Sequence, residues 1–317
     1  MKKLQAVLVL PPGRAGAIAD AGLRRWLSRG EITDHGARKG MLHAVCDVLG
    51  MTLPDGLAAL RFWGQTGERS SAWIAAADPV HLAAHLDHLT LRSLHCKVQL
   101  SDLRPLFDHL QTTVGSDEYA FARIGQYAYV RGDEPFATAA ISSIPIDGLP
   151  PDEFLPTGEE ASRFDSLLSE VQMALHEHEV NTHREYIGQM PVNSLWIWGG
   201  GVAPEEATQA TLPLFGDDPL FRGMWYSRNG LVEPWSDGLA ACVELAEAGF
   251  VAVVPELTKE GAAETPDAHL RELKSLLRSG EVEKATVLFR DGLQVDIKSS
   301  DRLRIWRRES EVFSPHE

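Results

Sequence analysis

The pattern of apolar and polar positions predicts a chain in which strands and helices alternate. The apolar run at residues 4–10 ends in Pro11-Pro12-Gly13, which is typical of a buried strand. Residues 250–254 and 285–289 predict two more buried strands. Helical spacing of apolar residues predicts helices at residues 18–27 and 266–278. This alternation, with short connections, indicates an α/β protein with a mostly parallel sheet and flanking helices.

Turn signals add an edge hairpin and a candidate boundary. Asp291-Gly292 joins the runs 285–289 and 293–297, which predicts an antiparallel hairpin at the edge of the sheet. Residues 144–158 are rich in Pro and Gly and form the best candidate linker. That linker divides the chain into an amino-terminal α/β lobe, residues 1–150, and a carboxyl-terminal α/β lobe, residues 151–317. The alternative is one continuous domain.

Composition narrows the range of partners. The 317 residues carry 45 acids against 30 bases, a formal net charge of −15. A field of that sign repels nucleic-acid phosphates and anionic membranes, so neither is an expected partner. It leaves room for a small anion in a local basic pocket.

The cysteines and the lengths of the apolar runs predict the cellular compartment of the protein. Cys46, Cys96 and Cys242 are odd in number and have no CxxC spacing, which indicates buried thiols in a reducing environment. No apolar run is long enough to span a bilayer, and residues 1–14 lack a signal-peptide pattern. We therefore expect a cytoplasmic protein.

The segment HEHEVNTHREYIGQMPVNSLWIWGGG, residues 176–201, carries the main candidate site. Its predicted strand, residues 194–198, runs into three glycines, and bare backbone at a strand end is where α/β sheets usually keep a ligand. Arg184 can hold a carboxylate or phosphate that Asn181 orients; the alternative is helix capping and a surface ion pair with Glu177 or Glu185. Asn193 either joins this site or bridges two loops through its side chain.

A second candidate follows a strand predicted at residues 72–76. His81, His85 and His88 lie at i, i+4 and i+7. In a helix, His81 and His85 could share a metal ion; the alternative is a solvated histidine-rich segment, because Pro79 disfavours a helix. For Asp78 and His81, a structural turn after the strand and a ligand contact both stay open. No GxSxG elbow and no cysteine in a reactive context support a nucleophilic triad.

Two motifs carry a family resemblance. The pattern VNxHR at residues 180–184, followed by Gly188, PVNSL at residues 191–195 and the glycine-rich strand end, resembles cofactor-independent phosphoglycerate mutases of the archaeal type, in the alkaline-phosphatase superfamily. ADPVHL at residues 77–82 together with NSLWxWGGG resembles bacterial RpfE-type regulatory proteins, which are phosphoglycerate mutase-like. The resemblance implies an alkaline-phosphatase-like phosphomutase core.

The resemblance also implies a catalytic apparatus that this chain lacks in places. The mutases use two divalent metals and a hydroxyl nucleophile, and one metal ligand is an Asp at the end of the first strand. In this chain the corresponding residues are Pro11-Pro12-Gly13-Arg14, without an Asp. The only histidines after Gly201 are His269 and His316. Trp198 stands where the mutases usually have an arginine. The chain is therefore expected to be a pseudoenzyme.

The expected function is that of a non-catalytic or weakly catalytic regulatory protein, with no cofactor. Its partner would be a small phosphorylated or carboxylate ligand, or another protein. The alternative is an active metal-dependent phosphoglycerate mutase or phosphatase whose rearranged ligands hold Mn, Zn or Mg. The candidate ligand contacts are Asn181, Arg184, Asn193, Gly199, Gly200, Gly201, Asp78 and His81.

Overall fold

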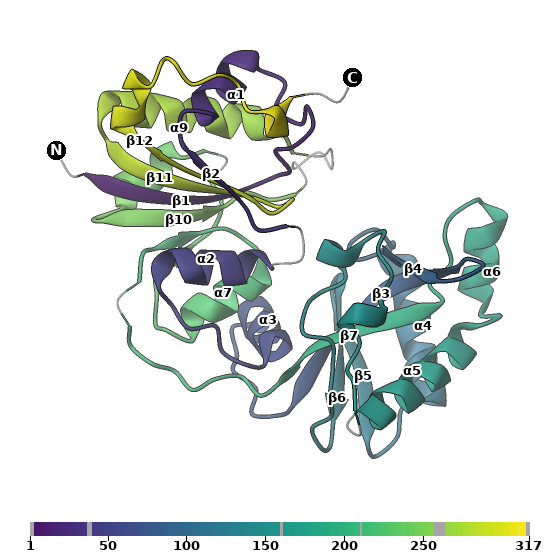
Figure 1. Cartoon of the computed structure of the whole chain (residues 1–317). Coiled ribbons are helices and arrows are strands. Elements are labelled where there is room, and N and C mark those ends of the chain that lie inside the picture. Colours follow the sequence, from purple (N-terminus) through teal and green to yellow (C-terminus); the bar gives the residue numbers. More distant parts are fainter. Residues whose placement is uncertain are drawn as a thin grey trace. The chain divides into compact units, whose positions relative to one another are not determined.

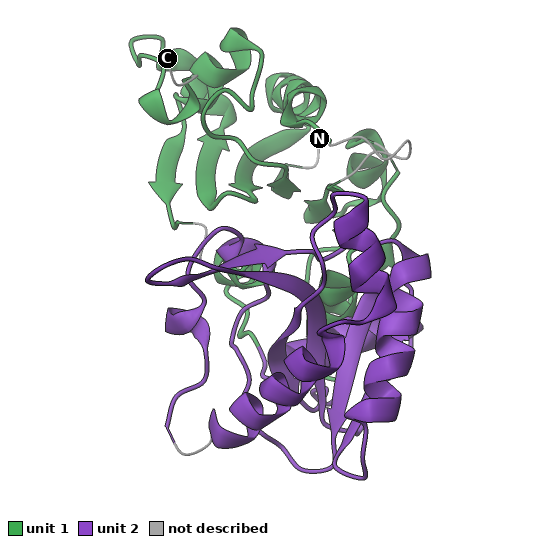
Figure 2. Cartoon of the chain, turned by 90° about the vertical axis from the view of Figure 1, so that its right-hand side faces the viewer, with its two compact units in different colours: residues 1–53, 206–317 green, residues 54–205 purple. Residues whose placement is uncertain are grey.

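The chain divides into two compact units. The computed structural model (Figure 1) describes residues 3–36, 40–158, 161–209, 211–236, 238–256 and 264–314, so that His316 lies outside the described residues. Unit 1 comprises residues 1–53 and 206–317, and unit 2 comprises residues 54–205 (Figure 2). These bounds differ from the boundary expected near residue 150. The reason is that the first strand of the chain pairs with strands from its last quarter.

Unit 1 is built on a mixed, mostly parallel seven-stranded sheet. The strand order is β2-β12-β11-β1-β10-β8-β9. β1 lies between β10 and β11 and runs parallel to both, whereas β12 is antiparallel to β11 and β2 is antiparallel to β12. The predicted α/β class and the antiparallel β11–β12 hairpin are thus confirmed, but the edge strand on that side is β2 and not β12. The strands are β1 (Leu4–Leu10), β2 (Glu31–Asp34), β8 (Leu214–Phe215), β9 (Val232–Glu233), β10 (Gly249–Val253), β11 (Val282–Phe289) and β12 (Leu293–Lys298).

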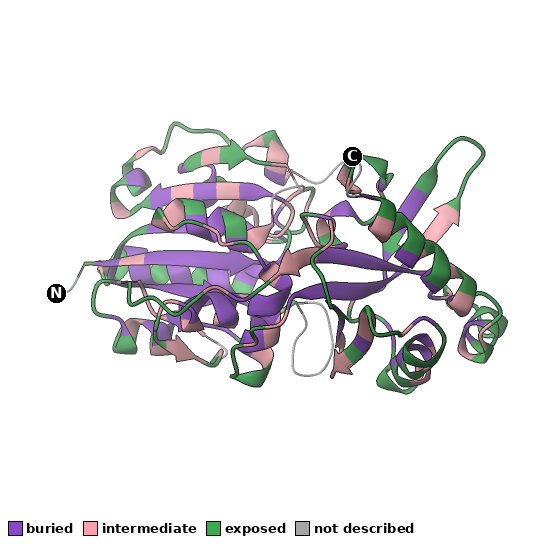
Figure 3. Cartoon of the chain, turned by 90° about the horizontal axis from the view of Figure 1, so that it is seen from below, coloured by how far each residue is buried: buried purple, intermediate pink, exposed green. Residues whose placement is uncertain are grey.

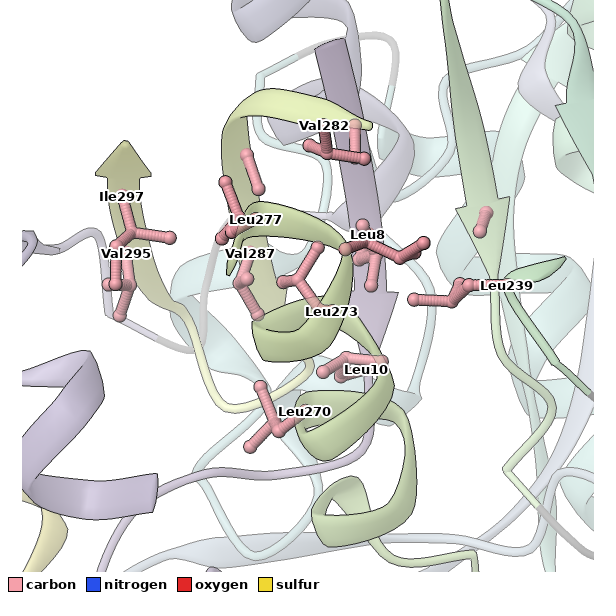
Figure 4. Packing of buried hydrophobic residues seen from close by; sticks show 14 of the residues in the cluster. Leu8, Leu10, Leu239, Leu270, Leu273, Leu277, Val282, Val287, Val295 and Ile297 are labelled. Atoms are coloured by element: carbon pink, nitrogen blue, oxygen red, sulfur yellow. The ribbon is translucent and has the colours of Figure 1, made fainter. Parts of the chain in front are cut away.

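Helices cover this sheet and form a core with it. α9 begins with Pro266, whose missing N–H costs nothing in a first turn, and ends at Gly280 in the left-handed conformation. Its residues Leu270, Leu273 and Leu277 gather around Leu8 of β1 (Figure 4). Burying each such leucine stabilises the fold by about 2 kcal/mol. The helices of unit 1 are α1 (Ala21–Leu27), α2 (Met41–Leu49), α7 (Pro219–Tyr226), α8 (Ala240–Leu245) and α9 (Pro266–Ser279), with short 3-10 turns η3 (Ser299–Leu303) and η4 (Glu311–Phe313).

Unit 2 is organised around one long strand, β3. β4, β6 and β7 all pair with β3 in antiparallel fashion, and β5 pairs with β6. In each unit the central strands are buried and the outer helix faces are exposed (Figure 3). The strands are β3 (Ile74–Ala84), β4 (Leu89–Ser93), β5 (Tyr119–Ile124), β6 (Tyr127–Gly132) and β7 (Ser194–Gly201). The helices are α3 (Leu57–Thr66), α4 (Leu100–Thr113), α5 (Ala161–Leu175) and α6 (Glu179–Tyr186), with 3-10 turns η1 (Ile144–Ile146) and η2 (Asp152–Phe154).

The course of β3 corrects two expectations. A structural turn at residues 78–81, one of the two alternatives left open there, is wrong, because the strand continues through Pro79 to Ala84. Pairing with β7 up to residue 80 and with β4 from residue 80 onward outweighs the local preference of proline for a turn. His81 therefore lies in a strand and His85 in the connection to β4, so they are not one helical turn apart. Among the described helices, none combines the length and hydrophobicity of a transmembrane span.

Candidate functional site

Asn181 and Arg184 lie on α6, and the structure uses both to hold backbone segments together. Asn181 Nδ2 donates to the carbonyls of Leu175 (2.9 Å) and Val192 (2.8 Å), and its Oδ1 accepts from Val192 N (2.8 Å). Both amide hydrogens and the carbonyl are therefore engaged. The side chain ties the end of α5 to the residues before β7. These contacts give Asn181 a structural role that differs from helix capping, which was the structural alternative.

Arg184 forms an ion pair, but with a partner other than the two expected. Its Nη1 lies 2.8 Å from Asp102 Oδ2 of α4, and its Nε donates to Met190 O at 2.9 Å. The side chain is only 4% exposed. The guanidinium thus fastens the loop after α6 to α4. An incoming anion would have to displace a carboxylate that is already paired.

Asn193 and His81 join the two long strands of unit 2. The regular pairing of β3 with β7 ends at Val80 and Ser194. One residue further on, Asn193 Oδ1 accepts from Leu82 N (2.7 Å) and its Nδ2 donates to Leu82 O (2.9 Å). The side-chain amide therefore extends the ladder as a peptide group would. His81 Nδ1 lies 3.0 Å from Pro191 O and adds a further link.

The three glycines let other parts of unit 2 approach the end of β7. A Cβ on Gly200 would lie 2.4 Å from the Trp73 ring, and one on Gly201 would lie 2.5 Å from Gly56 Cα. Gly199 has a φ of 63° and packs on Leu57, at the start of α3. Gly200 N also donates to Thr138 Oγ1 (3.0 Å). On the side where a Cβ would stand, the protein's own atoms cover this backbone, and the three glycines remain partly exposed elsewhere.

Beneath this strand end lies a buried charged cluster centred on Asp78, which is 1% exposed. Arg61 Nη1 of α3 lies 2.8 Å from Asp78 Oδ1, and Trp198 Nε1 donates to Oδ2 at 2.7 Å. His95 Nδ1 approaches Oδ1 to 3.2 Å. The Arg61 guanidinium also faces the Tyr129 ring, 4.8 Å from its centroid. Trp198 thus supplies a hydrogen-bond donor to Asp78.

Opposite charges decide the ionisation of this cluster. Burial alone would raise the pKa of Asp78, but Arg61 and His95 hold it well below its usual range. Burial alone would lower the pKa of His95, but the charge of Asp78 raises it to about 10. The one local sign of this cluster is a single arginine, Arg61, among the otherwise apolar residues 57–62.

The other candidate position is the carboxyl edge of the seven-stranded sheet, where parallel strands usually hold a ligand. Just after β1, the backbone N–H groups of Gly13 (2.6 Å) and Arg14 (2.8 Å) both donate to Asp291 Oδ2. Position 13 requires glycine, because a Cβ there would lie 2.6 Å from the Phe289 ring. The Arg14 guanidinium pairs with Asp34 and donates from Nε to Asp291 O (3.3 Å). Asp291 therefore occupies the position that an anionic ligand would take on these N–H groups.

A second arginine, Arg290, links the neighbouring strand ends. Arg290, directly after β11, lies with Nη1 3.1 Å from Glu256 Oε1 and donates from Nη2 to Val254 O at 3.1 Å. Its backbone N–H donates to Leu10 O at the end of β1 (3.0 Å). We refer to Arg14, Glu256, Arg290 and Asp291 as the strand-end network. In the ranges that the structure describes, no three His, Cys, Asp or Glu side chains are grouped as metal ligands. The sequence predicted Asp291 only as a turn residue.

The fold and the strand-end network define an α/β protein whose parallel strand ends are joined by arginine–carboxylate pairs. The chain is 30% identical over 111 residues to a 2,3-bisphosphoglycerate-independent phosphoglycerate mutase of Methanosarcina barkeri, which is 34% of this chain and 28% of that protein. It is 30% identical over 113 residues to a probable enzyme of the same name from Geobacter sulfurreducens, which is 35% of this chain and 28% of that protein. No family model matches.

Two solved structures align over most of the chain. A cofactor-independent phosphoglycerate mutase from Thermoplasma acidophilum has a TM-score of 0.41 and 16% identity, over 94% of this chain and 90% of that one. A Pyrococcus horikoshii protein has a TM-score of 0.49 and 14% identity, over 94% and 88%. The chain matches little more than a quarter of the length of the curated relatives. On sequence it is a distant relative of cofactor-independent phosphoglycerate mutases.

Proposed function

We propose that this chain is a regulatory protein related to phosphoglycerate mutases, which binds a small phosphorylated or carboxylate ligand and has little or no catalytic activity. The observation that carries the proposal is the strand-end network. The carboxyl edge of a parallel sheet is the usual ligand position in α/β proteins. In this chain two arginines stand there, each paired with a carboxylate of the same chain.

The chemistry of the network favours an anion over a metal pair. Two-metal phosphoryl transfer requires several carboxylate or imidazole groups that are free to coordinate. Asp291 Oδ2 instead accepts two backbone N–H groups, and Glu256 faces the guanidinium of Arg290. A guanidinium beside the site repels a divalent cation, whereas it can pair with phosphate or carboxylate oxygens in a bidentate manner.

Arg14 is the group most available to a ligand. Its side chain is about one-third exposed (33%), whereas Arg290 is 16% exposed. A phosphate could replace the surface carboxylate of Asp34 as the partner of Arg14 with little loss, since exposed ion pairs contribute at most about 1 kcal/mol. By contrast, Asn181 and Asn193 bond to backbone groups through both polar atoms of their side chains. Arg184 already pairs with Asp102. This comparison favours the strand ends of unit 1 over the glycine segment of unit 2.

The proposal is tested by binding and turnover measured on the same preparations. 3-Phosphoglycerate is titrated into the wild-type chain, Arg14→Ala and Arg25→Ala by calorimetry. Arg25→Ala is the matched control, because Arg25 is an arginine on α1 whose hydrogen-bond acceptor, within the described part of the chain, is Ala21 O alone. Losing a charge-assisted hydrogen bond should weaken binding by about ten- to a hundredfold in Arg14→Ala and leave Arg25→Ala unchanged.

Turnover is measured as interconversion of 3- and 2-phosphoglycerate with added Mn²⁺, Zn²⁺ or Mg²⁺, beside an active mutase. We expect no turnover above the protein-free reaction. Stoichiometric bound metal together with turnover that a chelator abolishes would show the active-enzyme alternative to be correct. Equal affinity of the wild-type chain and Arg14→Ala for 3-phosphoglycerate would contradict an anion site at Arg14. No binding to the wild-type chain would contradict it as well.

A further inference from the structure

Residues 302–308, RLRIWRR, form a basic and apolar stretch in an acidic chain. They include four arginines and no acid, although the whole chain has a formal net charge of −15. Leu303, Ile305 and Trp306 are 67%, 76% and 74% exposed. Single exposed apolar residues are ordinary on a protein surface, but three within four positions indicate a surface that has a partner. We refer to residues 302–308 as the basic-apolar segment.

Hydrogen bonds hold the basic-apolar segment against the end of α1. Arg304 Nη1 donates to Arg29 O (3.2 Å), and Arg29 Nη1 donates in return to Arg302 O (3.1 Å). Arg307 Nη1 donates to Gly30 O. The segment is therefore a fixed part of unit 1, and the exposure of its three apolar side chains follows from the fold.

The four arginines of the segment have two different functions. The guanidinium groups of Arg304 and Arg307 donate to the backbone of residues 29 and 30 and so fix the segment. Arg302 and Arg308 are exposed, and neither side chain has a hydrogen-bond or ion-pair partner within the described residues. These two are available to the phosphate or carboxylate groups of a partner.

The acids at the two ends of the segment are already paired. Asp301 Oδ1 lies 3.2 Å from Arg304 Nε, and Glu309 Oε1 lies 2.6 Å from Arg24 Nε. Each of these acids thus has an arginine of its own. The three other arginines of the segment keep their positive charge uncompensated by either acid.

The net charge of the whole chain does not decide what this face attracts. Two exposed acids, Glu31 and Glu311, lie close in sequence, and two further cations, Arg25 and Arg29, offset them. Exposed charges more than about 10 Å away are largely screened at 0.1 M salt. The repulsion of anionic membranes expected from the net charge therefore does not apply to the basic-apolar segment.

The exposed side chains favour a lipid surface as the partner. Tryptophan is enriched at the headgroup level of membranes, aliphatic side chains enter the acyl boundary, and cations pair with anionic lipids. A nucleic-acid strand stacks its bases on aromatic rings, so it would use Trp306 but leave Leu303 and Ile305 exposed. An anionic membrane uses the aromatic, the aliphatic and the charged groups together.

We propose that the basic-apolar segment binds this protein to anionic membrane surfaces. Leu303, Ile305 and Trp306 enter the boundary between headgroups and acyl chains, and Arg302 and Arg308 pair with lipid phosphates. The binding is peripheral and reversible, because three side chains bury too little apolar area for a permanent anchor. This function is additional to ligand binding at the strand-end network and does not depend on it.

The test is co-sedimentation of the full chain with lipid vesicles. Vesicles of phosphatidylcholine with about one-third phosphatidylglycerol are compared with pure phosphatidylcholine, at about 0.1 M and about 0.5 M salt. The wild-type chain should bind the anionic vesicles about tenfold more tightly than the neutral ones. The higher salt should weaken this binding, because it screens the arginines.

Variants separate the apolar from the charged contribution. Trp306→Ala should weaken binding to anionic vesicles about tenfold, because it removes the largest inserted side chain. Arg302→Gln combined with Arg308→Gln should weaken binding about tenfold at the lower salt and little at the higher. Tyr186→Ala and Arg104→Gln are the matched controls, since they remove an exposed ring and an exposed arginine of unit 2, and should leave binding unchanged.

Insertion is measured separately from sedimentation. Phosphatidylglycerol with brominated acyl chains should quench tryptophan fluorescence in the wild-type chain and much less in Trp306→Ala. Circular dichroism checks that each variant is folded. Binding that requires anionic lipid, and that only the variants of the basic-apolar segment weaken, supports the proposal.

Three results would overturn the proposal. One is a wild-type chain that does not sediment with anionic vesicles, which requires no variant. Another is equal binding to anionic and neutral vesicles. The third is equal loss of binding in Trp306→Ala and Tyr186→Ala, which would reflect exposed rings in general. Binding to a single-stranded oligonucleotide that Trp306→Ala abolishes, without binding to vesicles, would show that the partner is a nucleic acid instead.

Discussion

Asp78 is a buried carboxylate whose three partners come from separate parts of unit 2. Arg61 lies on α3, Asp78 on β3, His95 after β4 and Trp198 on β7. A buried charge is tolerated when it is paired and hydrogen-bonded, and removing one partner leaves the other without compensation. The cluster therefore fixes how these elements pack, and Trp198 has a structural function within it.

Replacing Asp78 tests this at the scale of one residue. Asp78→Asn keeps the shape but leaves Arg61 buried without a counter-charge, so the free energy of unfolding should fall by about 3–5 kcal/mol. Asp87→Asn removes a carboxylate that is 85% exposed, so the free energy of unfolding should change by less than about 0.5 kcal/mol. Urea denaturation measures both. Similar stabilities for the two variants would contradict the assigned function of Asp78.

At the scale of the element, α6 depends on a neutral histidine. His178 caps this helix by accepting from Val180 N at its Nδ1 atom (3.2 Å), which only an unprotonated nitrogen can do. Burial lowers the pKa of His178, and the nearby His109 lowers it further, while Glu179 opposes the shift. The unfolded chain therefore takes up this proton first as the pH falls below 6.5.

We therefore expect acid to loosen α6. The contribution of the cap is fully present above the ordinary histidine value of 6.5 and is lost as the pH falls through the lower folded-state pKa. Amide hydrogen exchange in α6, compared at about pH 7.5 and about pH 5.5, should show a loss near 1 kcal/mol. His178→Asn keeps a cap that does not titrate and should remove this difference, whereas the exposed His176→Asn should retain it. A difference that persists in His178→Asn would exclude this cap as the cause.

At the scale of the whole molecule, the chain leaves unit 1 after residue 53 and returns to it at residue 206. Unit 2 is therefore continuous in sequence. It has a core of its own, in which β3 and β7 pack against α4 and α5. Unit 1 requires both ends of the chain, because β1 pairs with β10 and β11.

This arrangement predicts how fragments behave. The fragment 54–205 should fold alone and unfold cooperatively in urea, since it retains every strand of its sheet. The fragment 1–150 is the amino-terminal lobe expected from the sequence. It should not fold alone, because β1 would lack its partners β10 and β11, and β3 would lack β7. Circular dichroism and urea titration of both fragments test this. A cooperative transition in 1–150 only would contradict the division into these units.

The sequence by itself determined the features that depend on local pattern. The strand predicted at residues 4–10, the Asp291-Gly292 turn and the helix near residues 266–278 all appear in the structure. In each case neighbouring residues carry the signal, because the spacing of side chains or the backbone freedom of glycine acts over a few positions. Its motifs also pointed to the phosphoglycerate mutases.

Only the tertiary structure decided which polar groups meet. Trp198 and Asp78 are 120 positions apart, and Asp291 and Gly13 are 278 apart, yet each pair is within hydrogen-bond distance. No local pattern encodes such contacts, because strand pairing and core packing bring these positions together. For the same reason β3 runs through Pro79, and Cys96 is exposed, against the expectation that all three thiols are buried. Packing therefore determines whether a polar side chain remains available to a ligand.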